Sequence, residues 1–375
     1  MGGTVFVLGA GASFGDALEF QDGYSGDKAQ VPPRPPLTNQ FFDATHINGD
    51  PHEIEQQNRP LISHIRHHWG ITETLGEGAW NFLSIEEVFS ALALLNDFSP
   101  PSSDEKANSQ LLLNDLTRFI RRSISMSTLF RFGTHTQRLA QHLKPNDSVI
   151  NFNYDLLMDQ ELLVNKGPLQ YQNFSVKFFG TDLIDPGAGY HDIRQFLTEP
   201  ISAGSTNGPS GPAEGLYLKP HGSLNWFTCP NTGCPRSRSF VVLTSITQCL
   251  ASSAWSINFQ CNYCHSELTA LLVPPLSQKP IMNNPHLRNI WGNAFAVLAN
   301  AAKIVIIGFS FQPSDFYAAW LFRYGLHYRQ DARVLVVNPA NKSDSAFQVR
   351  MESIFGTRYD GTWTEFDQLD QIISA

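Results

Sequence analysis

Two short polar motifs in this sequence carry side chains suited to chemistry on a bound ligand. Asn153 and Asp155 follow an apolar run at residues 148–152, and His221 lies in a Pro-His-Gly turn after the short run at 216–218. A carboxamide can hold a hydroxyl group or a water molecule in a fixed orientation, and a histidine can accept a proton near neutral pH. Asp155 also has a simpler interpretation, as the cap of the helix that follows it. Asn153 and His221 together therefore predict proton transfer at an oriented hydroxyl group or water.

A glycine-rich turn follows the apolar run at residues 4–8. In Gly9-Ala10-Gly11-Ala12-Ser13, the first glycine permits a tight turn and the second lets the backbone approach a pyrophosphate at a helix N-terminus, while the serine adds a hydroxyl donor. The third glycine and the acidic residue of the complete dinucleotide-binding fingerprint are not at their usual places. A sharp strand-to-helix connection explains this turn equally well.

Asn338 occupies a similar position after the apolar run at residues 333–337. Its side chain offers both a donor and an acceptor, which suits the hydroxyl groups of a ribose. Alternatively, Asn338 and Pro339 simply form a turn. On this motif alone, the turn is the favoured interpretation.

Four of the five cysteines form two close pairs, Cys229-x4-Cys234 and Cys261-x2-Cys264. This spacing predicts a zinc ribbon with four thiolate ligands, whereas two unrelated pairs of free thiols are the alternative. Four thiolates leave no open coordination position, so we expect a structural metal. Two further ligand candidates lie near the second pair, and one cysteine is left over; these residues are His265, Glu267 and Cys249.

The elements around these motifs follow an α/β pattern. Apolar strands are expected at residues 4–8, 148–152, 216–218, 303–307 and 333–337, with helices at about 286–302 and 314–328. Continuous apolar strands separated by helices indicate a parallel sheet that is covered on both faces. The glycine, asparagine and histidine motifs stand just past the carboxyl ends of these strands, where open α/β sheets bind ligands.

An amphipathic block separates the first strand from the second. Ser84 to Glu87 has the form of a capping box, in which the serine and the glutamate each bond the other residue's backbone. Two apolar faces at helical spacing follow; they consist of Ile85, Val88, Phe89 and Leu92, and of Leu112, Leu116, Phe119 and Ile120. We expect an all-helical insertion of about a hundred residues, an ordinary size for a module.

The composition indicates a globular protein. The chain has 375 residues, of which 42% are hydrophobic and 16% charged, and its net charge is -8. This charge gives no global attraction to nucleic acid or to an anionic membrane. No apolar stretch reaches the roughly 18 residues of a spanning helix, and we see no targeting segment. We therefore expect a cytoplasmic protein with neither a membrane partner nor direct nucleic-acid binding.

In this order, the glycine turn, Asn153-Tyr154-Asp155, His221-Gly222-Ser223, the two cysteine pairs and Gly308-Phe309-Ser310 resemble the sirtuins. The Asn-Tyr-Asp and His-Gly-Ser-Leu-Asn-Trp stretches are similar to those of the prokaryotic sirtuin-like branch associated with antiviral defence. The resemblance spans nearly the whole chain, and the combination is much more specific than any single motif. It implies a Rossmann-like, doubly wound NAD-binding domain with a helical insertion and a small zinc-ribbon module.

The resemblance also implies site residues and boundaries. Asn153 and His221 match the catalytic asparagine and histidine of the sirtuins. The residues assigned to the cofactor are Gly9, Ala10, Gly11, Ser13, Asp155, Gly308, Ser310 and Asn338, and those assigned to Zn2+ are Cys229, Cys234, Cys261 and Cys264. The expected NAD-binding domain covers residues 1–37, 145–226 and 269–375, the helical module covers 38–144, and the zinc module covers 227–268.

The departures from the sirtuin pattern fall in the peptide-binding segments. Deacylating sirtuins usually carry Gly-Ile-Pro-Asp-Phe-Arg after the glycine motif, and a Phe-Gly-Glu segment beside the acyl-lysine channel; this chain has neither. We therefore expect an NAD+ hydrolase that releases nicotinamide and ADP-ribose. An NAD-dependent protein-lysine deacylase is the alternative, and a non-catalytic NAD or ADP-ribose sensor is a further one.

The resemblance also suggests how such an activity would be controlled. Unrestrained NAD+ hydrolysis would be toxic, so we expect regulation in an antiphage, abortive-infection setting. The expected means are homo-oligomerisation, a partner such as a ring-forming ATPase, or a component of the invader. The helical insertion and the loop at residues 203–215 are the expected control surfaces.

Overall fold

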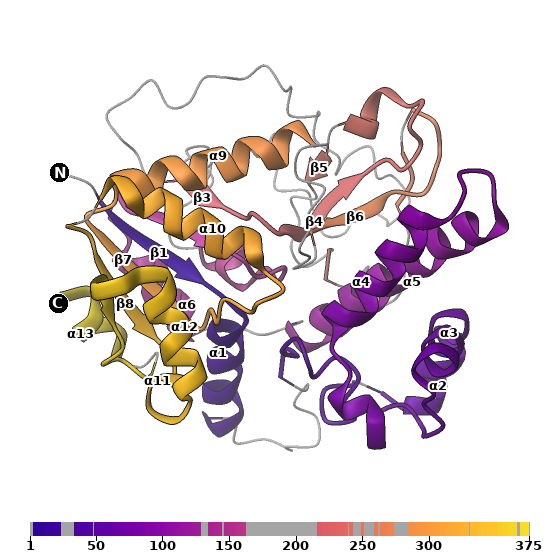
Figure 1. Cartoon of the computed structure of the whole chain (residues 1–375), viewed down its shortest axis with the longest axis horizontal. Coiled ribbons are helices and arrows are strands. Elements are labelled where there is room, and N and C mark those ends of the chain that lie inside the picture. Colours follow the sequence, from indigo (N-terminus) through magenta and orange to yellow (C-terminus); the bar gives the residue numbers. More distant parts are fainter. Residues whose placement is uncertain are drawn as a thin grey trace, which may run out of the picture. The chain divides into compact units, whose positions relative to one another are not determined.

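The chain is described by a computed structural model that covers residues 3–23, 34–47, 49–128, 134–144, 146–162, 216–238, 240–242, 249–250, 259–261, 263–273, 284–329, 331–365 and 368–374. The loop at 203–215 lies outside these residues. The chain divides into two compact units (Figure 1). The first unit comprises Met1–Gly23, Phe132–Ile246 and Phe259–Ala375, and the second comprises Tyr24–Arg131 and Thr247–Asn258. The domain boundaries expected from the sequence stay predictions.

The first unit is built on a six-stranded parallel sheet. The strand order is β3-β2-β1-β7-β8-β9, and every neighbouring pair is parallel. This order reverses on either side of β1, as in the doubly wound Rossmann arrangement, so the predicted fold class is confirmed. The strands are β1 Thr4–Leu8, β2 Ser148–Asn151, β3 Tyr217–Leu218, β7 Lys303–Ile307, β8 Arg333–Val337 and β9 Tyr359–Asp360.

Side chains of the central strands are buried on both faces of the sheet. In β1, Val5 and Val7 belong to one apolar core, whereas Phe6 and Leu8 belong to the other. Successive side chains of a strand point to opposite faces, so each face must be covered by helices. Helices α9, α10 and α12 contribute to the first core, and α1, α6 and α13 to the second. The continuous apolar character of these strands, seen in the sequence, follows from this double burial.

The helices of the first unit begin and end close to the predicted positions. The predicted helix at 314–328 is α10 with a short 3-10 turn, and Asp315 caps its start. None of the described helices is long and apolar enough to cross a membrane. The bounds are α1 Ala10–Gly23, α6 Thr134–His142, η4 Pro235–Arg238, α9 Pro285–Asn300, α10 Phe316–Gly325, η6 Leu326–Tyr328, α11 Ala340–Ser343, α12 Ser345–Phe355, η7 Gly356–Arg358 and α13 Leu369–Ser374.

A second, antiparallel sheet in the first unit carries the cysteine motifs. Its strand order is β5-β4-β6, with β4 spanning Gly222–Thr228, β5 Phe240–Val242 and β6 Thr269–Leu272. Cys229 directly follows β4, and the second cysteine pair precedes β6. The two cysteine pairs thus flank a three-stranded antiparallel sheet, of which only β5 lies wholly within residues 227–268, and His221 stands immediately before its central strand.

In the described residues of the second unit, the regular elements are helices, and one isolated parallel bridge joins Asp43 and Gly76. Both apolar faces predicted from helical spacing point inward, although Phe89 is only partly buried. The predicted capping box at Ser84 is half correct: the serine accepts from the Glu86 backbone N–H, whereas Glu87 accepts from the Trp69 indole instead of bonding back. The helices are α2 Pro51–Gln57, α3 Arg59–Trp69, η2 Gly78–Phe82, α4 Ile85–Phe98 and α5 Asp104–Thr128.

Candidate functional site

The glycine turn after β1 lies against the turn after β7. The Gly9 N–H donates to the Ile307 carbonyl at 3.0 Å, and the Gly11 N–H donates to the Gly308 carbonyl at 2.9 Å. Gly308 has a φ of +62°, and a Cβ at this residue would lie 2.2 Å from the Ala12 nitrogen. Only glycine tolerates this combination of left-handed backbone and close approach. The glycines are thus explained by backbone packing alone, and the motif does not by itself indicate a nucleotide.

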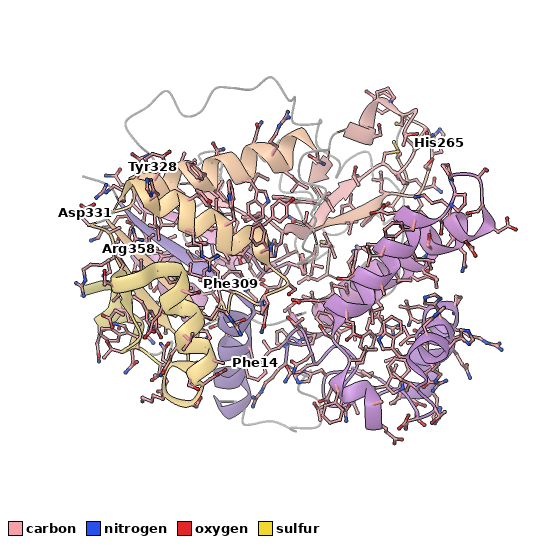
Figure 2. All side chains as sticks on the ribbon, viewed as in Figure 1. Phe14, His265, Phe309, Tyr328, Asp331 and Arg358 are labelled. Carbon is pink, nitrogen blue, oxygen red and sulfur yellow. The ribbon has the colours of Figure 1, made fainter. Side chains whose placement is uncertain are left out.

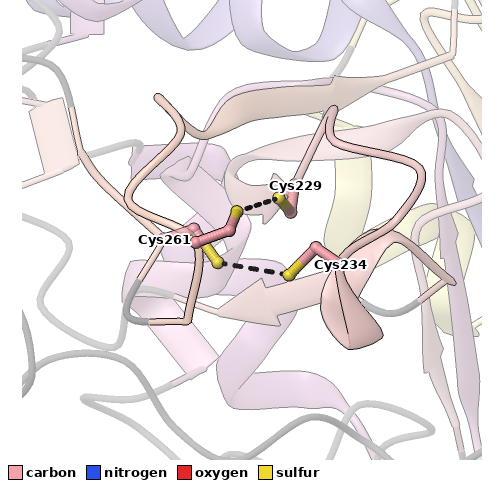
Figure 3. Close-up of side chains that lie close together, drawn as sticks. Cys229, Cys234 and Cys261 are labelled. Carbon is pink, nitrogen blue, oxygen red and sulfur yellow. Dashed lines mark hydrogen bonds between the residues drawn. The ribbon is translucent and has the colours of Figure 1, made fainter.

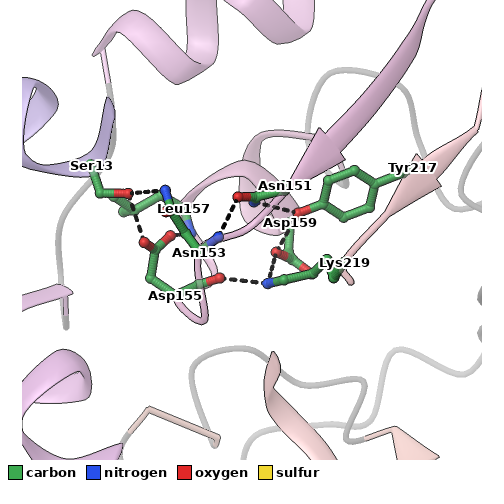
Figure 4. Close-up of polar contacts among 8 residues, drawn as sticks. All are labelled: Ser13, Asn151, Asn153, Asp155, Leu157, Asp159, Tyr217 and Lys219. Atoms are coloured by element: carbon green, nitrogen blue, oxygen red, sulfur yellow. Dashed lines mark hydrogen bonds and ion pairs between the residues drawn. The ribbon is translucent and has the colours of Figure 1, made fainter. Parts of the chain in front are cut away.

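Asn153 is held in one orientation at the end of β2. Its side-chain nitrogen donates to the Gly9 carbonyl at 2.9 Å. The same nitrogen donates to Ser13 Oγ, also at 2.9 Å (Figure 4). A carbonyl can only accept, so the amide nitrogen must face Gly9 and the Asn153 Oδ1 must face the other way. Asn153 is 8% exposed, and among the described residues this oxygen accepts no hydrogen bond. The structure therefore presents a fixed acceptor atom at the carboxyl edge of the sheet.

Asp155 completes this cluster and also caps the next helical turn. One carboxylate oxygen accepts from the Leu157 N–H at 3.1 Å, and the other accepts from Ser13 Oγ at 2.6 Å. The capping interpretation of Asp155 is thus correct in part, since the same side chain also orients the serine hydroxyl. Burial raises the pKa of Asp155 above its ordinary value, while Lys219 and Ser13 act in the opposite direction.

A buried chain of polar groups supports Asn153 from behind. The Asn153 N–H donates to Asn151 Oδ1 at 2.9 Å, and Asn151 Nδ2 donates to the Tyr217 hydroxyl at 3.0 Å. Tyr217 donates to Asp159 at 2.8 Å, and Lys219 Nζ lies 2.9 Å from the same Asp159 oxygen (Figure 4). The side chains of Lys219 and Asp159 are each only 2% exposed. Because such a network is costly unless every member is satisfied, it fixes the end of β2 rigidly.

Sequence reasoning missed these supporting residues. Lys219 also donates to the Asp155 carbonyl at 2.6 Å, which ties the end of β3 to the end of β2. The available signal was the spacing of Asp155 and Asp159, which is one helical turn, together with a lysine at a predicted strand end. A lysine is almost never fully buried unless it is paired.

A second buried acid, Asp16, lies on α1 one turn after the glycine motif. It accepts from the backbone N–H of His135 at 2.7 Å and from the backbone and hydroxyl of Thr136. Burial raises the pKa of Asp16 from 3.8 to about 7, and the nearby Asp155 carboxylate adds to the increase. Asp16 therefore joins α1 to the start of α6 within the first unit.

His221 lies in the tight turn that leads from β3 into β4. Gly222 has a φ of +81°, and a Cβ there would lie 2.0 Å from the Leu271 carbonyl oxygen, so the turn requires glycine at this position. The His221 carbonyl accepts from the Val273 N–H at 2.7 Å. The imidazole is 5% exposed, and its Nε2 lies 3.1 Å from an Asp315 carboxylate oxygen.

Phe152 brings the strand-end motifs together. This residue directly precedes Asn153, and its ring lies 4.8 Å from the His221 ring. The Phe152 ring also stacks on the Phe309 ring, with the ring centroids 4.4 Å apart and an interplanar angle of 4°. Phe309, which is labelled in Figure 2, is the central residue of Gly308-Phe309-Ser310. The ends of β2, β3 and β7 thus meet around one aromatic ring, with the glycine turn of β1 bonded to Asn153.

The remaining predicted residues are positioned differently. Asn338 uses its side-chain oxygen to accept from the Ala340 N–H at 3.0 Å, which is the turn-forming role considered above. The Ser310 carbonyl accepts from Arg350 at 3.0 Å. Ala10 is the first residue of α1. The assignment of these residues to a cofactor stays a prediction.

The four paired cysteines converge on one point. Cys229 and Cys264 have their sulfur atoms 3.4 Å apart, and Cys234 and Cys261 have theirs 3.7 Å apart (Figure 3). All four sulfurs lie within 4.8 Å of one another. A tetrahedral zinc ion with Zn–S bonds of about 2.3 Å separates its sulfurs by roughly 3.8 Å. The donor set therefore fits zinc, whereas a disulfide would need sulfurs about 2.05 Å apart. His265, Glu267 and Cys249 are not part of this group.

Comparisons with known proteins give similarity at the level of solved structures. No protein-family model matches the chain, and no curated protein matches it. A mutant Sir2 homologue in complex with 2'-O-acetyl ADP-ribose is 14% identical with a TM-score of 0.44, covering 99% of this chain and 90% of that chain. A Sir2 homologue in complex with NAD is 15% identical with a TM-score of 0.34, covering 76% of this chain and 82% of that chain. The Rossmann-like order is established by the strand pairing above and not by these similarities.

Proposed function

We propose that this chain binds NAD+ at the carboxyl edge of its parallel sheet and hydrolyses the bond between nicotinamide and ribose. The observation that carries the proposal is the meeting of Asn153, His221 and the Gly308-Phe309-Ser310 turn around Phe152. The motifs that resemble sirtuin NAD-binding motifs are thus neighbours in space, although they are far apart in the sequence. The convergence at the strand ends is the usual location of a ligand site in this fold.

The chemistry requires few protein groups. Nicotinamide leaves NAD+ as a neutral molecule, because the electrons of the broken bond cancel the positive charge of its ring. No general acid is then needed to protonate the leaving group, unlike at ordinary glycosides, where one of a pair of carboxylic acids has this role. A water oxygen forms the new bond to the ribose carbon and releases one proton. The protein has to orient the water or a ribose hydroxyl and accept that proton.

Asn153 and His221 are suited to these two tasks. The free Asn153 Oδ1 would accept a hydrogen bond from the attacking water or from a ribose hydroxyl, because the amide nitrogen is fixed by Gly9 and Ser13. His221 would accept the released proton, directly or through a ribose hydroxyl. The four thiolates would hold a structural zinc ion, which keeps the small sheet folded and takes no part in the chemistry.

The test is to incubate the purified chain with NAD+ and no peptide, and to follow nicotinamide and ADP-ribose by chromatography. We expect release by the unmodified chain and a decrease of about a hundredfold or more in Asn153→Ala and His221→Ala. Matched controls are Asn300→Ala and His327→Ala, which replace exposed residues of the same types. Unchanged release in both site variants would contradict the proposed site.

The two alternatives give different results in the same assay. A deacylase would release nicotinamide only when an acetylated peptide is added, and would then form O-acetyl-ADP-ribose. A sensor would bind NAD+ or ADP-ribose in calorimetry, without turnover and without dependence on His221. The absence of the usual peptide-binding segments favours hydrolysis over deacylation.

We also propose that the activity serves antiphage defence and is controlled by assembly. Homo-oligomers or a ring-forming ATPase partner are the assemblies that the sirtuin-like resemblance suggests. The decisive measurement is NAD+ turnover against protein concentration, alongside mass photometry. Turnover per chain should increase as larger species appear, and constant turnover across a change in assembly would exclude self-association as the control.

A further inference from the structure

Asp315 makes two contacts from one buried carboxylate. One oxygen accepts from the Ala318 N–H at 3.3 Å and so caps helix α10. The other oxygen lies 3.1 Å from His221 Nε2, and the two side chains are only 3% and 6% exposed. A carboxylate between a helix N-terminus and an imidazole is stabilised by the helix dipole and by the imidazole N–H.

This contact determines which imidazole nitrogen carries a proton. A neutral histidine has one N–H donor and one acceptor nitrogen, and a carboxylate can only accept. A hydrogen bond across this contact would keep the proton on Nε2 and make Nδ1 the basic nitrogen. The partner of one histidine nitrogen commonly sets the role of the other in this way.

The surroundings also restrict the orientation of the ring. The Phe152 ring meets the His221 ring nearly edge-on at 4.8 Å, and the Trp291 ring lies 6.3 Å away. Trp291 is itself fixed, because its indole N–H donates to the Pro220 carbonyl at 3.0 Å. A 180° flip of the imidazole about its Cβ–Cγ bond would place a carbon instead of Nε2 beside Asp315, and the rings of Phe152 and Trp291 stand next to the ring that would have to turn.

We propose that Asp315 is a positioning residue for His221: it holds the Nε2–H tautomer, leaves Nδ1 to accept the proton, and stabilises the imidazolium that forms. The catalytic part of this inference rests on the proposed function, whereas the tautomer does not. Asp315 was not among the residues predicted from the sequence, and its N-cap position alone would account for an aspartate. The contact with His221 is what adds a second role.

The first experiment needs no substitution in Asp315. The histidines are labelled with 15N, the tautomer is read from the ring nitrogen shifts by NMR, and the His221 signal is assigned by its loss in His221→Ala. We expect Nε2–H with a neutral ring. A protonated Nδ1 in the neutral ring of the unmodified chain would overturn the proposal, whether or not the chain hydrolyses NAD+.

The second experiment separates positioning from capping. Asn is as good an N-cap as Asp, so Asp315→Asn retains the start of α10 but replaces the carboxylate with a group that can donate to Nε2. We expect the Nδ1–H tautomer in this variant, and a kcat lower by about a hundredfold to ten-thousandfold with KM changed less than threefold. Asp344→Asn is the matched control, because Asp344 caps α12 through the Phe347 N–H at 3.0 Å.

The outcomes distinguish the two proposals. Asp344→Asn should leave both kcat and the His221 signal unchanged; an equal loss in both variants would assign Asp315 a capping role only. Asp315→Asn with an unchanged tautomer would also overturn the inference. If the unmodified chain shows no turnover of NAD+ under any condition, the proposed function fails, while the NMR result still decides the pairing of Asp315 with His221.

Discussion

The first unit contains two polar clusters. One is held together by hydrogen bonds between protein groups, whereas the other needs a metal ion from outside the chain. At the strand ends, donors and acceptors satisfy one another: Asn153, Ser13, Asp155 and Lys219 are joined by hydrogen bonds of 2.6 to 2.9 Å. In the small sheet, four cysteine sulfurs lie within 4.8 Å of one another. Sulfurs at such distances are held together stably by a metal, because thiolates bind zinc strongly and repel one another without it.

The difference separates a site that is preorganised by the fold from one that is completed by an ion. The strand-end network is formed when the parallel sheet forms, so its loss should appear as a change in overall stability. The cysteine cluster should instead respond to zinc, and its loss should remain local. Each prediction below tests one side of this contrast.

The largest effect is expected from removing the metal. Structural zinc contributes about 10–16 kcal/mol to small zinc-binding peptides near neutral pH. Cys261→Ser should abolish zinc binding, measured by elemental analysis, and should expose the amides of β4 and β6 to hydrogen exchange. Cys249→Ser is the control, since Cys249 is fully buried but lies outside the cluster. Retention of zinc and of amide protection in Cys261→Ser would contradict a four-thiolate site.

The next largest effect is expected at Lys219. Lys219→Met leaves the buried Asp159 carboxylate without its cation, and breaking a buried ion pair costs about 3–5 kcal/mol of unfolding free energy. Urea unfolding should show this decrease, and adding Asp159→Asn should restore part of it. Arg118→Met, which removes the exposed Arg118–Asp115 pair, should cost less than about 1 kcal/mol. An equal cost for the two pairs would mean that the network is not preorganised.

A substitution of Gly308 tests how tightly the turn after β7 packs against the glycine turn after β1. Gly308→Ala introduces a Cβ 2.2 Å from the Ala12 nitrogen at a φ of +62°, whereas Gly70, which is also left-handed with a φ of +66°, has nothing within 4 Å of an added Cβ, so Gly70→Ala is the matched control. The left-handed conformation costs about 1–2 kcal/mol in both variants. The steric overlap should add about 1–2 kcal/mol in Gly308→Ala alone. Thermal unfolding of the two variants measures the difference in their unfolding free energies. Identical losses would show that the two turns separate at no cost.

The smallest effect concerns Asp16 and pH. Its pKa is raised by burial from 3.8 to about 7, so between these values the folded chain binds a proton that the unfolded chain has released. The stability contributed by this proton is present below about pH 4 and is lost as the pH increases through 7. One pKa unit corresponds to about 1.4 kcal/mol, and we expect a decrease of up to about 2.5 kcal/mol in unfolding free energy between pH 5 and 7.5. Asp16→Asn should flatten this dependence in urea unfolding, and an unchanged slope would exclude Asp16 as its source.

Part of this molecule could be predicted from its sequence because the relevant signals are local. The apolar runs at 4–8, 303–307 and 333–337 are buried on both faces, which makes them continuous and easy to locate. The positions of Asn153 and His221 past strand ends follow from the apolar runs at 148–152 and 216–218. The cysteine spacing similarly predicted a cluster that the folded chain forms.

The rest depends on contacts between segments that are distant in the sequence. The pairing of His221 with Asp315 requires β3 and the start of α10 to meet, and no local pattern contains that information. Lys219 is typical of an exposed residue, and its burial is understandable only once Asp159 is known to face it. The role of Glu87 was likewise decided by Trp69 on another helix and not by the capping pattern.

Strand β4 links the two clusters covalently. It begins directly after His221 and ends directly before Cys229, so the histidine and the first thiolate occupy opposite ends of one seven-residue strand. A regular strand of this length is about 23 Å long. An oxidant or chelator that loosens the sulfurs would therefore act on the strand that leads directly to the His221 turn, so a local effect of zinc loss would reach His221 along β4.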